Sequence, residues 1–226
     1  MPQVVDWGRR DYLDALAEMR RMVRARRSGT IPDTLMLVEH PSVVTVGVEG
    51  DDGAAAASGF PVVAVERGGR ATYHGPGQLV GYAVVDLDAR NRDVRRFVHE
   101  LEEVVVDALA AHGLASGHVS GRHGVWVDGE RKIASIGIAV ERWVTFHGFA
   151  LNVDLDLAPF GQFRPCGLDG SLMTSVAREL GRPVPLDAVK PAVVDAWARR
   201  FGATPAVAAS GPRREGPSPA TPPTPA

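Results

Sequence analysis

The sequence of 226 residues is poor in cysteine and has no long apolar run. Its single cysteine, Cys166, excludes an internal disulfide and a metal site made of several thiolates, and it agrees with a reducing compartment. No segment reaches the roughly 18 consecutive apolar residues of a membrane span, and charges near the N-terminus exclude an apolar signal-peptide core. We therefore expect a cytoplasmic protein.

Lysine is also scarce. Of the 25 lysines and arginines only two, Lys132 and Lys190, are lysines. An amine can lose its proton whereas a guanidinium cannot, so a retained lysine is a candidate for proton transfer. Lys190 lies in an amphipathic helical pattern and is interpreted as a solvated charge. For Lys132, at the start of "RKIASIGIAV", two interpretations stay open: a charge that protects an exposed strand edge, or a catalytic amine.

The segment 67–82, "RGGRATYHGPGQLVGY", is rich in glycine but contains neither a GxxxxGK[ST] nor a GxGxxG pattern. It also leads into an apolar strand instead of a helix, so a P-loop and a dinucleotide-binding turn are both excluded. A glycine-rich backbone can lie close to another molecule. Together with the small residues of "SIGIA" and "HGFALN", the segment predicts a narrow channel for a thin, linear chain.

Hydrophobic periodicity predicts one α/β (α+β) domain with a mixed, largely antiparallel sheet, because turns separate the strands as often as helices do. We assign residues 1–205 to this domain and residues 206–226 to a proline-rich, disordered tail that cannot bury enough apolar surface to fold. The pattern predicts helices over 11–27, 94–111, 171–181 and 186–201, strands over 35–39, 43–46, 62–66, 79–87 and 144–153, and a hairpin over 124–139 that turns at Asp128 and Gly129.

Cys166 lies in the loop-like segment "FRPCGLDGS". Arg164 beside it, and a helix expected to begin at position 171, would both favour the thiolate, whereas a lone cysteine is often only a small buried hydrophobe. The residues leave both interpretations open. A nucleophilic thiol needs a proton acceptor, and the candidates are Lys132, His74 and His147. The other histidines, at positions 40, 99, 112, 118 and 123, lie near expected loops or helix surfaces and are assigned no role.

Four ordered motifs carry a family resemblance. The stretches "RGGRATYHGPGQLVGY", "GVWV" with "RKIASIGIAV", "HGFALNV" and "PFGQFRPCG", preceded by "LVEHPSVVTVG", resemble the lipoyl(octanoyl) transferases of lipoate synthesis over residues 6–181. The resemblance implies a fold similar to the catalytic domain of biotin protein ligases and lipoate ligases. It also implies transfer of an octanoyl group from octanoyl-acyl carrier protein to a lysine of a lipoyl domain, through a thioester on Cys166, with Lys132 shuttling protons.

The same resemblance implies partners and substrate contacts. The expected acceptors are lipoyl domains of 2-oxoacid dehydrogenase complexes and the glycine cleavage H protein. No nucleic acid, membrane, metal or cofactor is expected, and the enzyme is expected to be a monomer. Phe163 departs from the family pattern and is expected to narrow the acyl slot. The expected substrate-binding residues are Arg67, Gly68, Gly69, Arg70, Ala71, Thr72, Tyr73, His74, Ser135, Ile136, Gly137, Gly148, Phe149 and Ala150.

The chemistry of these residues agrees with a covalent route. Moving an acyl group from one thioester to another is nearly balanced in energy, and attack by an amine then gives a more stable amide, so ping-pong behaviour is expected. Backbone N–H groups near Gly75, Gly77 and Gly167 are candidate donors to the oxyanion. The arginine-rich stretch 20–27 is either a docking face for acidic partner proteins or a solvated helix face.

Three alternatives stay open from the sequence. An ATP-dependent ligase for a free acid is disfavoured because no GRGRxxxxW-type motif is present. A non-catalytic module that binds acyl carrier proteins or lipoyl domains is disfavoured by the presence of both Cys166 and Lys132. A thioesterase would use water in place of the acceptor lysine, so only product analysis separates it from a transferase.

Overall fold

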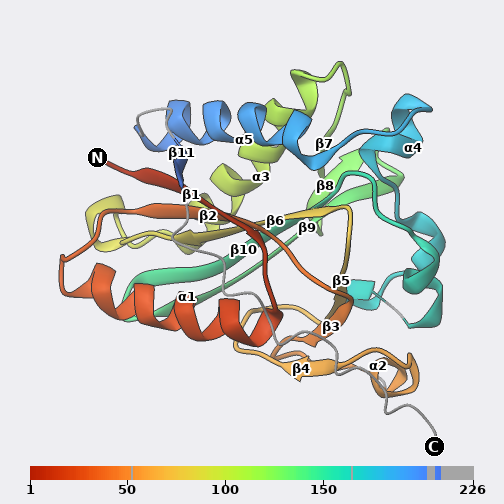
Figure 1. Cartoon of the computed structure of the whole chain (residues 1–226), viewed down its shortest axis with the longest axis horizontal. Helices are drawn as coiled ribbons and strands as arrows, with labels where there is room; N and C mark the ends of the chain where they lie inside the picture. The colour runs from red at the N-terminus through yellow and green to blue at the C-terminus, as the bar shows by residue number, and fades with distance from the viewer. Residues whose placement is uncertain (52, 164, 203–206, 210–226) are drawn as a thin grey trace, which may run out of the picture.

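The computed structural model describes residues 1–51, 53–163, 165–202 and 207–209, with the backbone alone for Cys166 and for 207–209. Among these residues an eight-stranded sheet has the order β11-β1-β2-β6-β10-β9-β8-β7 (Figure 1). β1 pairs in parallel with β11 and β2, and the other neighbours are antiparallel, so the expected mixed sheet is confirmed. Its strands are β1 (Gln3–Arg9), β2 (Thr34–Glu39), β6 (Gln78–Val84), β7 (Gly117–Val119), β8 (Arg122–Val127), β9 (Arg131–Glu141), β10 (Val144–Asn152) and β11 (Val207–Ala209).

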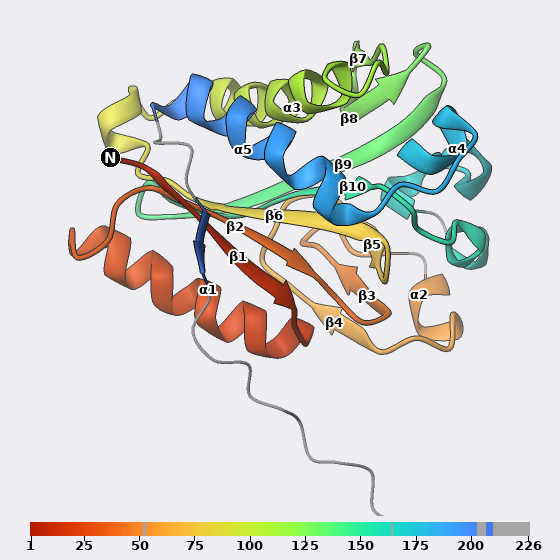
Figure 2. The same ribbon diagram turned by 45° about the horizontal axis from the view of Figure 1, so that its top comes forward.

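Helices cover both faces of this sheet. On one face lie α3 (Val94–Ala110) and α5 (Leu186–Phe201), and on the other lies α1 (Tyr12–Arg27) (Figures 1 and 2). Strand side chains alternate between the two faces, so the sheet presents apolar side chains to each helical layer. Leu101 and Trp197 are buried in the first layer, and Met19 and Val23 are buried in the second.

Local sequence signals account for the ends of the long elements. The Asp11 carboxylate accepts from the N–H of Leu13 at 2.8 Å and caps α1, and Asp93 caps α3 in the same way. The helices α1, α3 and α5 match their expected ranges to within one residue. The β8–β9 hairpin turns at Asp128 and Gly129, and both have the positive φ that a tight two-residue turn requires.

A second sheet of three strands lies beside the first. β3 (Val43–Val46) is its centre, with β4 (Val62–Ala64) parallel on one side and β5 (Ala71–His74) antiparallel on the other. The sequence analysis missed β5, and also β1, β7 and β11. These strands are short or interrupted by glycine, so partner strands decide them more than their own pattern does. β5 brings the glycine-rich segment against the large sheet.

The helix expected over 171–181 is wrong in its first half. Gly170–Leu172 forms only a 3₁₀ turn, and α4 spans Val176–Leu180 with Ser175 as its N-cap. The intervening chain is extended because Met173 forms a bridge with Lys132, and the N–H of Thr174 donates to the Lys132 carbonyl oxygen at 2.9 Å. A helix N-terminus therefore does not follow Cys166 as closely as expected, and that argument for a thiolate is lost.

The ends and surface add three observations. Within the range 206–226 that the sequence assigns to a tail, Val207–Ala209 adds a parallel strand to β1, while 206 and 210–226 lie outside the described residues. None of the helices in the described part of the chain combines the length and apolarity needed to cross a membrane.

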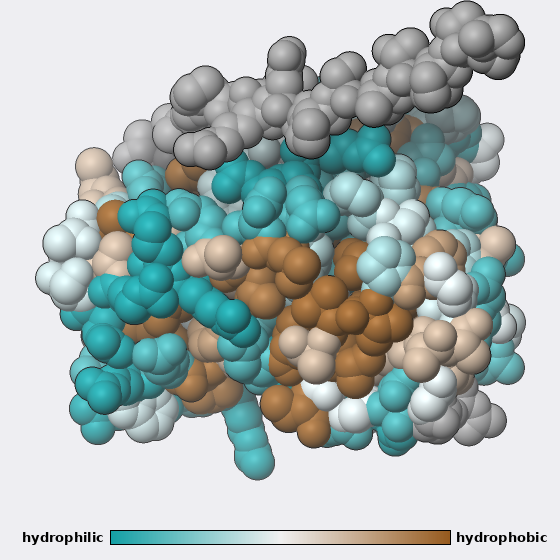
Figure 3. Space-filling model, turned by 60° about the horizontal axis from the view of Figure 1, so that its bottom comes forward, coloured by the Kyte–Doolittle hydropathy of each residue, from teal (hydrophilic) through white to brown (hydrophobic). Residues whose placement is uncertain are grey.

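On the face that lies at the bottom of Figure 1, apolar residues gather near the centre with hydrophilic residues around them (Figure 3).

Candidate active site

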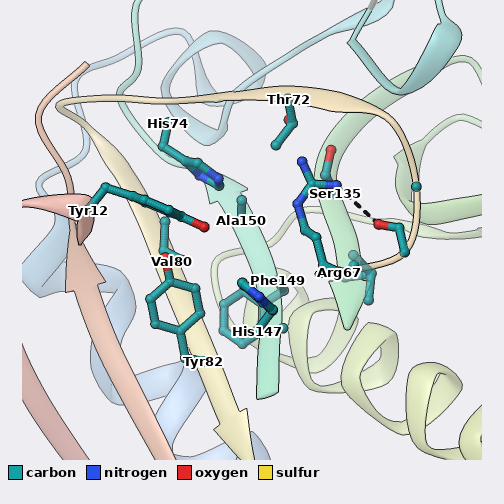
Figure 4. A pocket seen from close by; sticks show the side chains of 15 residues that line it. Tyr12, Arg67, Thr72, His74, Val80, Tyr82, Ser135, His147, Phe149 and Ala150 are labelled. Atoms are coloured by element: carbon teal, nitrogen blue, oxygen red, sulfur yellow. Dashed lines mark hydrogen bonds between the residues drawn. The ribbon is translucent and has the colours of Figure 1, made fainter. Parts of the chain in front are cut away.

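A narrow pocket lies where the second sheet meets β6, β9 and β10. Its volume is about 40 Å³, and we call it the glycine-lined pocket. Tyr12, His74 and Tyr82 lie on one side of it, and Arg67 and Ser135 lie on the other (Figure 4). Its lining residues are Tyr12, Arg67, Gly68, Gly69, Thr72, His74, Val80, Tyr82, Ser135, Ile136, Gly137, His147, Gly148, Phe149 and Ala150.

Most of the expected substrate-binding residues meet at this pocket; Arg70, Ala71 and Tyr73 do not line it. In β5 side chains alternate, so Thr72 and His74 face the pocket while Ala71 and Tyr73 face the other way. Ala71 and Tyr73 lie in a separate apolar cluster, where the Tyr73 ring packs edge-on against Phe160. A continuous run of strand residues could not all face one ligand.

Arg67 holds the glycine-rich loop in shape. Its buried guanidinium donates to the carbonyl oxygens of Gly68 and Arg70 from one nitrogen, and to the carbonyl and hydroxyl oxygens of Thr45 from the other, at 2.8 to 3.1 Å. Gly47 lies against this loop, and a Cβ there would lie 2.3 Å from a loop carbonyl oxygen. The loop can take this closed shape because one guanidinium satisfies its buried carbonyl groups, and because Gly47 has no side chain to collide with it.

His74 lies at the centre of a buried hydrogen-bond network. Gln78 donates from Nε2 to Tyr73 O and Asn152 Oδ1, so its Oε1 is the acceptor for His74 Nδ1–H at 2.8 Å. The other ring nitrogen lies 3.3 Å from the Thr45 hydroxyl, which is placed to donate to it. Burial is the main cause that lowers the pKa of His74 to about 3, with the charges of His40 and Arg67 adding to it. His74 is therefore neutral at physiological pH.

The network continues to the strand that carries Lys132. Asn152 Nδ2 donates to the carbonyl oxygen of Thr174 at 2.9 Å, and the N–H of Thr174 donates to the carbonyl oxygen of Lys132 at the same distance. Thr174 is eight residues beyond Cys166. Thus the segment that follows Cys166 is attached both to the pocket network and to β9.

The sequence analysis assigned no role to three residues near the pocket, Tyr12, His40 and Tyr82. His40 Nδ1 donates to the carbonyl oxygen of Arg10 at 2.8 Å, and its Nε2 accepts from the Tyr82 hydroxyl at 2.8 Å. Burial lowers the pKa of His40 to about 4 and raises the pKa of Tyr12 to about 12. His40 had been assigned no role, although it lies within the family-like stretch "LVEHPSVVTVG".

His147 is strained and points into the pocket. It has a φ of 59° in the middle of β10, a conformation that costs a non-glycine residue about 1–3 kcal/mol. Its N–H donates to Met19 Sδ at 3.0 Å, and its buried Nε2 has no hydrogen-bond partner among the described residues. The Glu66 carboxylate lies 3.7 Å from that nitrogen. Burial, with the charge of Arg67 as the next cause, lowers the pKa of His147 to about 4.

A wider cavity of about 350 Å³ adjoins the glycine-lined pocket, and we call it the Lys132 cavity. Lys132 is only 3% exposed and belongs to an interior strand, so the interpretation of its charge as protection of a strand edge is wrong. Its Nζ lies 5.5 Å from the centre of the Trp126 ring. The lining residues are Glu49, Gly68, Gly69, Arg70, Val98, Gly121, Arg122, His123, Trp126, Lys132, Ile136, Gly137, Ile138 and Leu168; four of them, Gly68, Gly69, Ile136 and Gly137, also line the pocket.

The segment that follows Cys166 reaches this cavity. Cys166 itself lies in a 3₁₀ turn, Pro165–Gly167, while its side chain lies outside the described structure. A Cβ on Gly167 would lie 3.2 Å from Cδ of Arg70, and Leu168 lines the Lys132 cavity. The structure therefore brings the backbone on the C-terminal side of Cys166 to the cavity that also contains Lys132.

The structure also bears on the predictions made for Phe163 and for the oxyanion donors near Gly75, Gly77 and Gly167. Phe163 is buried with Phe160 in the apolar cluster and lines neither the pocket nor the cavity, so it narrows neither of these two spaces. Gly75 and Gly77 belong to the β5–β6 turn, away from both spaces, and the Gly77 N–H already donates to Glu39 at 2.8 Å. Gly77 is therefore wrong as an oxyanion donor, whereas Gly167 stays a prediction.

Four of the five arginines of α1 are engaged in ion pairs, which favours the interpretation as a solvated helix face. The pairs are Arg20 with Glu66, Arg21 with Glu18, Arg26 with Asp33 and Asp86, and Arg27 with Glu141. In the described residues, the side chains grouped closely enough to hold a metal ion are His99, Glu102 and His118, which lie on α3 and β7 outside both spaces.

Comparison with known proteins agrees with this geometry. Residues 11–198 match the model of the lipoyl protein ligase A/B catalytic domain family. An octanoyltransferase of Geobacter sulfurreducens is 44% identical over 196 residues, covering 87% of this chain and 83% of that protein.

Two solved structures share the fold at low sequence identity. A lipoate-protein ligase A bound with ATP has a TM-score of 0.73 at 17% identity and covers 92% of this chain and 89% of its own. The biotin protein ligase of Aquifex aeolicus has a TM-score of 0.54 at 9% identity and covers 89% of this chain and 70% of its own. The expected likeness to both ligase folds is confirmed.

The chain belongs to the lipoyl protein ligase A/B catalytic domain family. Within that family it groups with the octanoyltransferases, and it is an enzyme of the acyltransferase class.

Proposed function

We propose that this protein transfers an octanoyl group from octanoyl-acyl carrier protein to a lysine of a lipoyl domain, through a thioester on Cys166. The observation that carries the proposal is that Leu168, two residues after Cys166, and the amine-bearing Lys132 line the same cavity. The only cysteine and one of only two lysines thus belong to segments that border one space. The proposal retains the expectation of a cytoplasmic monomer that uses no cofactor.

The two adjoining spaces suit two substrates. Apart from His147 Nε2, the polar groups around the glycine-lined pocket bond mainly to neighbouring protein groups, which leaves apolar side chains such as Val80, Phe149 and Ala150 to meet a ligand. An octanoyl chain suits that surface, because glycines bring backbone close without side chains, but the pocket of about 40 Å³ must widen to take the whole chain. The wider Lys132 cavity gives a protein-borne group access to the thioester.

In the first step the Cys166 thiolate attacks the carbonyl carbon of the octanoyl thioester. A new carbon–sulfur bond forms, the bond to the carrier thiol breaks, and the carrier leaves as a thiol after taking a proton from the Lys132 ammonium. A thiolate is the reactive form of cysteine, so the proton first passes from Cys166 to the neutral Lys132 amine.

In the second step the amine of the acceptor lysine attacks the enzyme thioester. The amide forms, the carbon–sulfur bond to Cys166 breaks, and Lys132 accepts the proton that the new amide nitrogen loses. Lipoyl domains of 2-oxoacid dehydrogenase complexes and the glycine cleavage H protein are the proposed acceptors. The amide is more stable than the thioester, so this step draws the transfer forward.

The test uses the fact that the chain has one cysteine. Incubation with octanoyl-acyl carrier protein should add one octanoyl group to the intact protein, and hydroxylamine or a lipoyl domain should remove it. Cys166→Ser should lose transfer, as should Cys166→Ala. Full transfer by Cys166→Ala would show that the covalent route is wrong, and release of free octanoate in place of the amide would identify a thioesterase.

An ATP-dependent ligase is the alternative to exclude experimentally. The likeness to an ATP-bound lipoate-protein ligase is a likeness of fold at 17% identity. We expect no octanoylated lipoyl domain from free octanoate and ATP. Its formation at a rate similar to that with the carrier thioester would overturn the proposed donor.

A further inference from the structure

A group of metal-ligating side chains lies between α3 and the β7–β8 hairpin. His99 and Glu102 of α3 and His118 of β7 place one ligand atom each within 4.8 Å of the others. We propose that these three side chains bind one zinc-class divalent ion, which has a structural role and lies outside the glycine-lined pocket and the Lys132 cavity.

The local structure brings the three side chains to one point. His99 and Glu102 are three residues apart on α3, so they share a face of the helix. β7 runs past that face and contributes His118, whose ring centre lies 4.6 Å from that of His99. Glu102 is buried, whereas the two histidines are open to solvent, so an ion can reach them.

The hydrogen bonds around the group orient it for a metal. His118 Nδ1 faces Glu102 Oε2 at 3.1 Å, while its Nε2 lies 2.6 Å from Glu103 Oε1. A histidine that binds metal through one nitrogen typically donates the other N–H to a carboxylate, which is the role Glu103 is placed to fill. Glu103 is itself held by Arg200 at 2.9 Å.

Glu102 is oriented from the opposite side. Its Oε1 accepts from the N–H of Gly124 in β8 at 2.8 Å, which leaves Oε2 to face the histidines. Two imidazole nitrogens and one carboxylate oxygen favour zinc or a similar ion over calcium and magnesium, which prefer oxygen ligands. Three protein ligands leave a fourth position for water.

The competing interpretation is an ion-paired histidine without metal. A doubly protonated His118 between Glu102 and Glu103 would satisfy the same two short contacts. That arrangement gives no role to His99, whereas a metal site uses it as a ligand. The dependence of zinc affinity on His99 therefore separates the two interpretations.

The location suggests what the ion would stabilise. A Cβ on Gly124 would lie 2.7 Å from Cε of Lys132, so β8 packs directly on the Lys132 side chain. An ion held by α3 and β7 would fasten the β7–β8 hairpin to the helix. Zinc would then raise the melting temperature of the protein, since it binds the folded state alone.

The experiment uses the untagged full chain, stripped of metal with a chelator and then titrated with Zn²⁺ alone against a zinc indicator. Cys166→Ser serves as the background, so that the thiol cannot contribute. We expect one zinc per chain. Glu103→Gln should weaken binding about 10- to 100-fold, and His99→Ala and His118→Ala should weaken it further. His112→Ala, beyond the end of α3, is the control and should bind as the background does.

A second measurement needs no substitution in the cluster. Co²⁺ in place of zinc should give the visible d–d bands of nitrogen and oxygen coordination in the Cys166→Ser protein. Absence of saturable zinc binding would overturn the proposal. So would absence of those bands, or equal affinity in the His99→Ala and His112→Ala proteins.

Discussion

The glycine-lined pocket and the Lys132 cavity meet at β9 but are built in opposite ways. The pocket is narrow, and its buried polar side chains bond to groups just behind its wall: Arg67 to Thr45, His74 to Gln78 and Tyr82 to His40. The cavity is about nine times larger and is bordered by exposed residues such as Arg122 and His123, with Lys132 as its buried amine. Regular strands form most of the glycine-lined pocket, while loops contribute to the Lys132 cavity.

In the proposed function, the contrast explains how one fold would treat two substrates differently. In the proposed function the pocket takes a small, featureless group, and the network of hydrogen-bonded buried groups around it would hold its shape. A lysine presented by another protein needs an opening instead.

The largest expected effect is on the amine of the cavity. Lys132→Ala should lower the rate of transfer about 10²- to 10⁴-fold, because proton transfer in both steps depends on it. Lys132→Arg should not restore the rate, since a guanidinium cannot give up its proton. The measurement is octanoylation of a lipoyl domain, followed by mass spectrometry.

The other lysine is a matched control. Lys190 pairs with Asp6 at 2.9 Å and Asp187 at 2.8 Å, far along the chain from the site. Lys190→Ala should keep the wild-type rate and lose at most about 1 kcal/mol of stability. Equal rates in the Lys132→Ala and Lys190→Ala proteins would show that the amine of the Lys132 cavity takes no part in the transfer.

A smaller effect should come from the network of the pocket. Gln78→Leu removes the partner of His74 Nδ1, Tyr73 O and Asn152 Oδ1, and each buried group left unpaired costs about 1–3 kcal/mol. We expect a loss of about 2–4 kcal/mol in the free energy of unfolding, measured with urea. Gln162→Leu, at an exposed position, is the control and should change stability by less than about 0.5 kcal/mol. Similar loss in both proteins would show that the network does not stiffen the pocket.

The smallest effect is the pH dependence contributed by one histidine. Burial lowers the pKa of His147 to about 4. Between about pH 6.5 and 4, the unfolded chain is therefore protonated at this histidine while the folded protein is not. Its contribution to stability is present above pH 6.5 and is lost progressively as the pH falls toward 4. Its share of the slope is about 1.4 kcal/mol per pH unit at most.

His147→Asn should flatten that slope by about this amount, because asparagine tolerates the positive φ but does not titrate. Urea unfolding between pH 7.5 and 5 measures it. The exposed His123→Ala protein should keep the wild-type slope. An unchanged slope in His147→Asn would mean that this histidine is not held neutral by burial.

Residue patterns predicted much of the site, but they did not predict which side chains point into the pocket. The glycine-rich segment, "SIGIA" and "HGFALN" were correctly expected to line one narrow space. Ala71 and Tyr73 were misplaced because β5 was not recognised, and only a strand turns alternate residues away. His40 was dismissed because its partners, Arg10 and Tyr82, are distant in sequence and meet it only in the folded chain.

The sequence by itself determined the long helices, the β8–β9 hairpin and the family, because caps, turn residues and motif spacing are local properties of the chain. Only the tertiary structure decided that Lys132 is buried, that Thr174 ties the segment after Cys166 to β9, and that His147 is bent into the pocket. Those features depend on hydrogen bonds and packing between segments far apart in the chain, and no local pattern encodes which distant groups will meet.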